Sequence, residues 1–341
     1  MIPPASAPAF LESCGWGGAR IEPLAGDASF RRYFRVLDGA RRAVLMDAPP
    51  PQEDVLPFIA VAEWLCGHGF AAPAIWGRDV EQGLLLLEDF GDALVRERVE
   101  VDPAAEEGIY ARAIDLLAAL HRLPAADVPA YDRAVYQREA ALLTEWYCPA
   151  IGLDADEAGY AAAWDAVLPL VEADATPPVT VLRDYHAENI MILPDAGEGG
   201  GAGGDRTFGL GLLDFQDALA GHPAYDLVSL LQDARRDVDP ALEHAMLARY
   251  RASAPVSADF DAAYAILGAQ RNAKIIGIFT RLWKRDGKPR YLSLLPRMWG
   301  LLERDLAHPA LAPVKAWFDA HIPADRRHHA LAHEASEGTG A

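Results

Sequence analysis

The chain has 341 residues, 51% of them hydrophobic, which is enough to bury the core of two domains or of one large one. Asp and Glu number 50 against 31 Lys and Arg, so a formal charge of -19 disfavours nucleic acid and anionic membranes as partners and favours a small polar ligand. Three scattered cysteines without CxxC spacing, no basic and apolar leader, and no apolar run of roughly 18 residues predict a cytoplasmic protein without zinc or membrane spans.

The N-terminal part of the chain has the pattern of a small sheet with one helix. Strand-like segments separated by turns predict an antiparallel meander at residues 20–24, 30–37 and 41–47. Between Val55 and Leu65 apolar residues recur at helical spacing, which predicts one amphipathic helix. Two further strands are expected around Ile75 and at residues 83–87.

Helical patterns dominate after residue 88. Amphipathic helices are predicted at residues 104–123, 131–147 and 157–173. We therefore expect an α+β fold with a sheet-rich lobe at 1–88, a larger helical lobe at 89–324 and a disordered tail at 325–341.

The segment 197–205 is rich in glycine and allows two interpretations. Glycine-rich backbones can cradle phosphates, but this segment lacks the Lys-Ser/Thr that follows in a phosphate-binding loop. Because it joins two strand-like runs, we interpret it as a flexible hairpin loop.

Three polar residues, Asp184, Asn189 and Asp214, stand next to short apolar runs. Asp184 and Asn189 lie five positions apart, and Asp214 follows further along the chain. Runs rich in branched residues predict buried strands at 179–182, 190–193 and 208–213. The three side chains are therefore expected at strand ends around one crevice.

This arrangement is typical of a phosphoryl-transfer site. The reaction needs a carboxylate near the acceptor hydroxyl and oxygen ligands that hold magnesium against the phosphates of ATP. Asp184 would orient the hydroxyl and accept its proton, while Asn189 and Asp214 would hold the metal ion. The alternative is that Asp184 and Asn189 cap turns and that Asp214 is a satisfied buried acid.

Three segments around these residues resemble the aminoglycoside phosphotransferase family, relatives of the protein kinases with the same two-lobed fold. They are the catalytic loop Leu182–Asn189, the metal-binding turn Leu213–Gln216 and the helix start Gly221–Leu227. The resemblance covers most of the chain and implies ATP and Mg²⁺ as cofactors, with the base and metal roles already given to the three residues.

A narrower resemblance lies within that family. The phrases at residues 211–219, 221–238 and 269–279 resemble the bacterial kinases that phosphorylate the anomeric 1-hydroxyl of N-acetylmuramate and N-acetylglucosamine in cell-wall recycling. The resemblance implies an amino-sugar substrate. The alternatives are another small-molecule kinase of the same fold, acting on an aminoglycoside, an amino alcohol or a thioribose, and a non-catalytic pseudokinase.

The resemblance also implies roles for residues around the catalytic loop. The backbone at Leu87, Glu88 and Asp89 would form the hinge that meets adenine. Asp226 would bond back to the catalytic loop, and His186 would orient the backbone of that loop. Asp226 and His186 would thus support the site without touching substrate.

The nucleotide-covering segment departs from the kinase pattern. Gly26 and Ser29 lie where phosphates would be met, but a single glycine replaces the Gly-x-Gly-x-x-Gly of protein kinases. Met46 stands where the ATP-binding lysine is expected, so a nearby arginine would have to supply the positive charge. The candidates are Arg31, Arg32 and Arg35, and Arg32 is taken as the nucleotide-binding one; all three could equally line the outside of a strand.

Glu53 and Glu63 are the candidates for the acidic partner of the missing lysine. Without that lysine, solvated side chains are the favoured interpretation of both residues.

An acceptor site is predicted around residues 262–290, which are unusually cationic for so acidic a chain. Arg271, Lys274 and Arg281 lie at helical spacing, and Arg271 and Asn272 are the candidate substrate residues. A carboxylate-bearing sugar would be attracted to such a face, whereas a polycationic aminoglycoside would be repelled. Tyr136 and Tyr147 could stack on a sugar, although a place in the core is the favoured interpretation.

Overall fold

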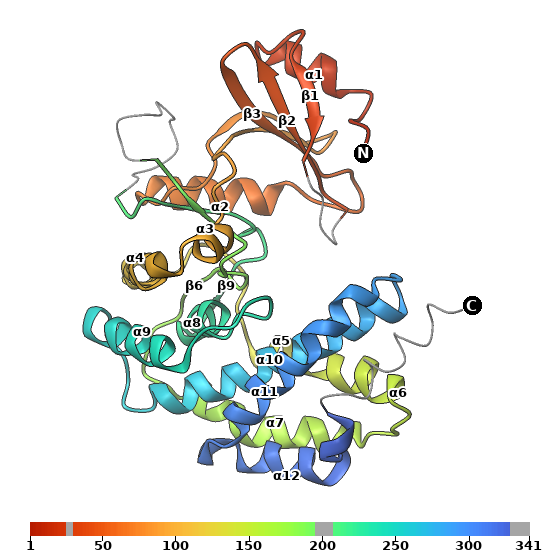
Figure 1. Cartoon of the computed structure of the whole chain (residues 1–341), viewed down its shortest axis with the longest axis vertical. Coiled ribbons are helices and arrows are strands. Elements are labelled where there is room, and N and C mark those ends of the chain that lie inside the picture. The colour runs from red at the N-terminus through yellow and green to blue at the C-terminus, as the bar shows by residue number, and fades with distance from the viewer. Residues whose placement is uncertain (25–29, 195–206, 328–341) are drawn as a thin grey trace. The chain divides into compact units, whose positions relative to one another are not determined.

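The computed structural model describes residues 1–24, 30–194 and 207–327 (Figure 1). These residues form two compact units, each made of two stretches of chain. Unit 1 consists of Met1–Leu116 and Leu182–Ala218, and unit 2 of Leu117–Val181 and Leu219–Ala341. The predicted lobe boundary at residue 88 falls inside unit 1, and the lobes as predicted stay a proposal.

Unit 1 contains a five-stranded antiparallel sheet with the strand order β1-β2-β3-β5-β4. Its strands are β1 (Arg20–Pro23), β2 (Arg32–Asp38), β3 (Arg41–Asp47), β4 (Ile75–Asp79) and β5 (Leu84–Glu88). The strands predicted from the sequence are confirmed. Every residue of β5 is buried, as expected for an inner strand covered on both faces.

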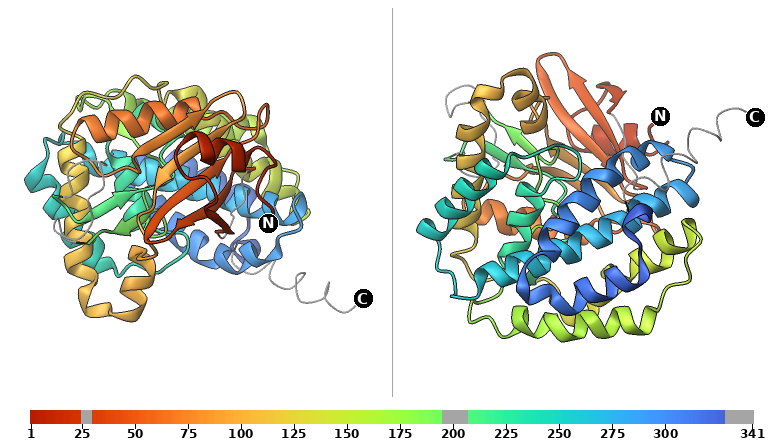
Figure 2. Two further views of the ribbon diagram at one scale, coloured as in Figure 1. Left: turned by 90° about the horizontal axis from the view of Figure 1, so that it is seen from above. Right: turned by 60° about the horizontal axis from the view of Figure 1, so that its bottom comes forward.

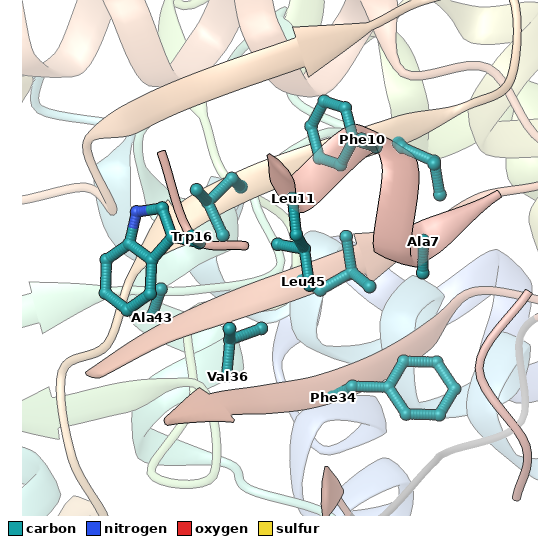
Figure 3. Close-up of a cluster of buried hydrophobic side chains, with 10 residues drawn as sticks. Ala7, Phe10, Leu11, Trp16, Phe34, Val36, Ala43 and Leu45 are labelled. Carbon is teal, nitrogen blue, oxygen red and sulfur yellow. The ribbon is translucent and has the colours of Figure 1, made fainter. Parts of the chain in front are cut away.

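A short helix, α1 (Ala7–Ser13), covers one face of this sheet. Its residues Phe10 and Leu11 pack with Trp16 against alternate residues of the strands, and Figure 3 shows this cluster in close-up. The strand residues of the cluster are Phe34, Val36, Ala43, Leu45, Leu84 and Leu86. Because side chains alternate between the two faces of a strand, the residues between these must face the other way.

Helices and a hairpin complete unit 1. The predicted helix at 55–65 is confirmed as α2 (Leu56–Gly67), and α3 (Val95–Val101) and α4 (Glu106–Leu120) follow. The hairpin strands β7 (Ile190–Ile192) and β8 (Leu210–Leu212) pair in antiparallel register. Phe58 of α2 packs against Phe215, which immediately follows Asp214, with ring centroids 4.9 Å apart. The turn that carries Asp214 is thereby packed against α2.

Unit 2 is helical apart from one strand pair, β6 (Val179–Val181) with β9 (Leu219–Gly221). Its α-helices are α5 (Arg133–Leu142), α6 (Cys148–Ala150), α7 (Glu157–Glu172), α8 (Ala224–Leu231), α9 (Pro240–Ser253), α10 (Phe260–Lys284), α11 (Leu295–Leu306) and α12 (Ala312–His321). The long helix α10 packs against α5, α7, α8 and α11, and Figure 2 shows it from two further sides. It is the central helix of the unit.

The predicted helices at 104–123, 131–147 and 157–173 are confirmed, with one local departure. The second ends in a π-helical turn at Leu143–Tyr147. Gly277 of α10 lies against the backbone of this region, and an added Cβ there would stand 2.3 Å from the carbonyl carbon of Leu142. Only glycine fits so close an approach of helix to backbone.

Two predicted flexible segments lie largely outside the described residues. Of the glycine-rich loop at 197–205, nothing falls within them. At the C-terminus, the short 3-10 helix Ala324–Arg326 is described, and Arg327 is buried with its guanidinium 3.1 Å from Asp319. Within the described part of the chain, no helix is both long and apolar enough to cross a membrane.

Candidate active site

The predicted catalytic loop is a compact series of turns that leads from β6 to β7. The amide of Asp184 donates to the carbonyl of Leu182 at 2.9 Å, and the amide of His186 donates to the carbonyl of Asp184 at 3.0 Å. The amide of Asn189 then donates to the carbonyl of His186 at 2.8 Å. These local bonds fix the backbone that carries Asp184 and Asn189.

The backbone is strained at two points of this segment. Among the described residues, the non-glycine residues with positive φ are Arg183 at 71° and Asp214 at 57°. The left-handed region is unfavourable for residues with a Cβ, by about 1–2 kcal/mol each. The hydrogen bonds of the loop and the packing of Phe215 hold these conformations, and strain of this kind gathers at functional sites.

Asn189 links the two carboxylate residues. Its amide nitrogen donates to the backbone carbonyl of Asp184 at 3.0 Å and to the Asp214 carboxylate at 3.3 Å. The same nitrogen lies 3.4 Å from the ring of His186. All of these contacts use the nitrogen, so the side-chain oxygen of Asn189 is the atom left to face a cation.

Gln216 holds the carboxylates that follow β8. Its amide donates to Asp214 at 2.9 Å and to Asp217 at 3.3 Å. Burial and the nearby Asp184 carboxylate raise the pKa of Asp214, although the Gln216 hydrogen bond and Arg31 oppose this shift. A carboxylate crowded by a second one is stabilised when a cation binds between them.

The donor chemistry of this site fits Mg²⁺. Carboxylate and amide oxygens are the hard ligands that Mg²⁺ takes, and the protein commonly supplies only one or two of them while phosphates and water supply the rest. Among the described residues, no group of three or more His, Cys, Asp or Glu side chains is arranged to hold a metal ion. The amide oxygen of Asn189 and the carboxylate of Asp214 are oxygen donors of the kind that Mg²⁺ takes.

The predicted nucleotide residues have mixed placements. Gly26 and Ser29 lie outside the described residues. Leu87 and Glu88 are buried in β5. The buried carboxylate of Asp89 accepts a hydrogen bond from the backbone amide of Gly91 and pairs with Arg35 at 2.8 Å. Only the backbone of this hinge is therefore suited to meet a base.

Arg32, the arginine chosen from the sequence, lies away from Asp214. Its Nε donates to the buried carboxylate of Asp47 at 2.7 Å. Arg32 and Phe34 are two positions apart on β2, so their side chains point to the same face of the sheet, the one covered by α1. We therefore do not retain Arg32 as the phosphate-binding cation.

Two other residues considered from the sequence, Arg31 and Glu53, form a pair beside Asp214 instead. The Nε of Arg31 donates to the Glu53 carboxylate at 2.9 Å, and both side chains are 13% exposed. The interpretation of Glu53 as a solvated side chain is therefore wrong, and the residue precedes α2 rather than lying on it. Glu63 is solvated as predicted, in an exposed ion pair with Arg78.

The supporting residues are buried. His186 is buried in the catalytic loop, in unit 1, and its contact with Asn189 fits the predicted orienting role. Asp226 is fully buried in unit 2, where its carboxylate lies 3.8 Å from the ring of His121. His121 in turn contacts the hydroxyl of Tyr250 at 2.8 Å, a pair that no sequence pattern had indicated.

The predicted acceptor residues are interior residues of unit 2. Arg271 donates to the hydroxyl of Ser229 at 2.9 Å, and Lys274 pairs with Glu139 at 2.9 Å, so these two charges do not form an open cationic face. Asn272 is fully buried and contributes to a polar cluster in the core. We therefore do not retain Asn272 as a substrate residue.

The aromatic candidates also belong to the core. Tyr136 and Tyr147 are buried, which agrees with the interpretation favoured from the sequence. The hydroxyl of Tyr147 donates to the backbone carbonyl of Arg327 at 2.9 Å. Neither ring presents a face for stacking on a sugar.

A comparison with known families decides the chemistry of this geometry. The profile of the phosphotransferase enzyme family matches residues 20–265, which include the catalytic loop, the Asp214 turn and the Arg31 pair. The chain belongs to this family. As a family member it is a phosphotransferase.

Two curated members of the family are similar along almost their full length. The N-acetylmuramate/N-acetylglucosamine kinase of Caulobacter vibrioides is 38% identical, over 95% of the chain and 98% of that protein. The protein of the same name from Pseudomonas aeruginosa is 39% identical, over 89% of the chain and 92% of that protein. The family resemblance stated from the sequence is confirmed.

Two solved structures share the fold at low identity. A choline/ethanolamine kinase family protein from Mesorhizobium loti has a TM-score of 0.62 and 16% identity, covering 92% of the chain and 97% of that structure. The streptomycin–ATP complex of APH(2")-IIa has a TM-score of 0.57 and 14% identity, covering 89% and 97%. The predicted protein-kinase-like α+β fold is confirmed.

Proposed function

We propose that this family member is an ATP-dependent sugar kinase that phosphorylates the anomeric 1-hydroxyl of N-acetylmuramate and N-acetylglucosamine. Four relatives at 34–39% identity carry the name N-acetylmuramate/N-acetylglucosamine kinase, each matched over most of its length. The observation that carries the chemistry is the amide of Asn189, which joins Asp184 to Asp214. The reaction would serve cell-wall recycling in the cytoplasm.

Asp184 acts on the acceptor hydroxyl. As a carboxylate at the turn of the catalytic loop, it orients the hydroxyl for in-line attack and accepts its proton as the bond to phosphorus forms. The hydrogen bonds of the loop backbone fix its direction before substrate binds. Most of the acceleration would come from this positioning and from charge stabilisation, rather than from covalent chemistry.

Asn189 and Asp214 would hold the metal ion. When bound, Mg²⁺ would neutralise the charge of the β- and γ-phosphates. Gln216 keeps the Asp214 carboxylate in place by its hydrogen bond at 2.9 Å, and the left-handed backbone at Asp214 sets the direction from which the carboxylate is presented. The backbone at Leu87–Asp89 is proposed to meet the adenine base, and Asp226 to brace the catalytic loop.

Arg271 remains the proposed contact for the acceptor. One terminal nitrogen of its buried guanidinium donates to Ser229, while the other has no hydrogen-bond partner among the described residues. A buried guanidinium nitrogen without a partner is costly unless a ligand supplies an acceptor. The carboxylate of N-acetylmuramate would supply one, and N-acetylglucosamine, which lacks that group, would not.

A panel of acceptors tests the proposed function. The protein is incubated with ATP and Mg²⁺ and with N-acetylmuramate, N-acetylglucosamine or kanamycin, and phosphorus NMR identifies the labelled oxygen. We expect an acid-labile 1-phosphate on the amino sugars and no product with kanamycin. Transfer to kanamycin alone would assign antibiotic modification, and failure with all three acceptors would favour a pseudokinase.

A further inference from the structure

The face of the sheet opposite α1 lacks the lysine that binds nucleotide phosphates in related kinases. Met46 of β3 stands at that place, and its Cα lies opposite that of Tyr33 on β2. Residues directly opposite in an antiparallel pair project to the same face. Arg31 precedes Tyr33 by two positions, so the alternation of the strand directs it to the Met46 face as well.

The surroundings of Arg31 are those of a functional cation. Its Nε is fixed by the Glu53 carboxylate at 2.9 Å, and one terminal nitrogen lies 3.8 Å from the Asp214 carboxylate. Both side chains of the Arg31–Glu53 pair are only 13% exposed, so the guanidinium is held in a largely buried setting. The guanidinium is thus anchored at one edge and directs its other edge toward the proposed metal site.

We propose that Arg31 is the cation that binds the nucleotide phosphates, with Glu53 as its anchoring carboxylate. The pair would replace the lysine–glutamate pair of related kinases, with the cation supplied from the residue just before β2 instead of from β3. A guanidinium offers donors at both edges, so one edge can hold Glu53 while the other meets phosphate oxygens. This inference rests on the proposed use of ATP.

The neighbouring arginines do not meet these conditions. Arg32 is paired with Asp47 and faces the α1 side of the sheet. Arg35 shares the face of Arg31, but Asp89 at 2.8 Å and Asp92 at 2.7 Å hold its guanidinium at the segment that follows β5. Arg31 alone of the three lies beside Asp214.

A purely structural ion pair is the competing explanation for Arg31 and Glu53. Such a pair would affect folding, and its loss would weaken the binding of all ligands of the site to the same extent. A phosphate-binding cation would instead affect ligands in proportion to their phosphates, because its energy depends on the charge that it meets. The length of the phosphate chain therefore separates the two roles.

The experiment measures equilibrium binding of adenosine, ADP and a non-hydrolysable ATP analogue by calorimetry, with Mg²⁺ and without acceptor. For Arg31→Gln we expect adenosine affinity within twofold of the wild type and a loss of about ten- to a hundredfold for the ATP analogue. Arg31→Lys should retain part of the lost affinity. Arg42→Gln, which removes one exposed charge from the same sheet, is the control and should bind all three ligands normally.

Glu53→Gln gives a second variant in case Arg31→Gln fails to fold. It leaves the guanidinium unanchored, so we expect a loss of affinity that is smaller than in Arg31→Gln and again confined to the phosphorylated ligands. Equal losses for adenosine and the ATP analogue, or a loss in Arg32→Gln but none in Arg31→Gln, would overturn the proposal. If the wild type bound no nucleotide at all, the proposed function itself would fail, which is a distinct result.

Discussion

Two segments of the chain carry similar polar residues and use them differently. In the proposed catalytic segment, residues 182–217, the polar side chains belong to turns at the ends of strands and lie around the Asp214 carboxylate. In helix α10, Asn272 is fully buried in unit 2 and donates to the buried side chains of Gln232 and Asp305. The turn frees a side chain from packing, whereas a central helix is covered on nearly every face, so its polar residues serve the core.

The contrast predicts that substitutions in the catalytic segment reduce activity and that substitutions along α10 reduce stability. Asp184→Asn provides the largest expected effect. Without a carboxylate to orient and deprotonate the hydroxyl, kcat should fall by about a thousandfold. The free energy of unfolding should stay unchanged or rise slightly, since one of two neighbouring carboxylates is removed. Kinetics with N-acetylmuramate, nucleotide calorimetry and urea unfolding on one preparation check this; lost nucleotide binding would contradict it.

Two asparagines allow a matched test of the same contrast. Asn272 donates to Gln232 at 2.7 Å and to the Asp305 carboxylate at 2.9 Å, all within the core of unit 2. Asn272→Ala leaves both acceptors short of a donor and should lower the free energy of unfolding by about 3 kcal/mol, with KM unchanged. Asn189→Ala should do the reverse, with normal urea unfolding and greatly reduced activity. A changed KM in a normally stable Asn272→Ala protein would restore Asn272 as a substrate residue.

Glycines on two helices sharpen the prediction for the core. Gly277→Ala places a methyl group against the backbone of Leu142 and should cost about 2 kcal/mol through overpacking. Gly300 of α11 has no atom within 4 Å of an added Cβ, so Gly300→Ala should instead stabilise by about 0.5–1 kcal/mol. Urea unfolding of both variants measures the difference. Equal stabilities would show that α10 is not packed as closely as the structure indicates.

A pH dependence of stability is expected from Asp305. Burial raises the pKa of Asp305 to about 8, although the amides of Gln232 and Asn272 donate to it. Since the folded pKa lies above the ordinary value near 4, its contribution to stability is present at low pH and is lost as pH rises toward 8. Relative to Asp305→Asn, the wild type should lose about 1 kcal/mol of stability per pH unit across that range. Parallel stability curves for the two proteins would rule this out.

The catalytic segment could be predicted because its signals are local. Asp184, Asn189 and Asp214 each adjoin an apolar run, and the strands that carry them were recognisable from branched residues alone. The choice between Arg31 and Arg32 could not be made in the same way. The choice depends on which of the two side chains lies on the same face of the sheet as Met46. Only the register of β2 against β3 determines that face.

Helical periodicity failed for α10 for a different physical reason. The spacing of Arg271 and Lys274 correctly placed both on one helix, but periodicity describes the relation of residues to each other and not what covers them. Neighbouring helices contact α10 on several sides, and they come from parts of the sequence distant from the cationic residues. The packing of α1 on the sheet was missed for the same reason, because its partners lie on three separate strands.

The division of each unit into two stretches of chain has a consequence for biosynthesis. Unit 1 needs residues as far as Ala218, yet the first stretch of unit 2 leaves the ribosome before them. While it is being translated, the chain therefore carries the five-stranded sheet without the Asp184 loop and a helical stretch without its central helix. Neither unit can be completed as a simple N-terminal fragment. A chain released by a ribosome that stalls before the Asp214 turn would therefore be inactive and would expose apolar surface.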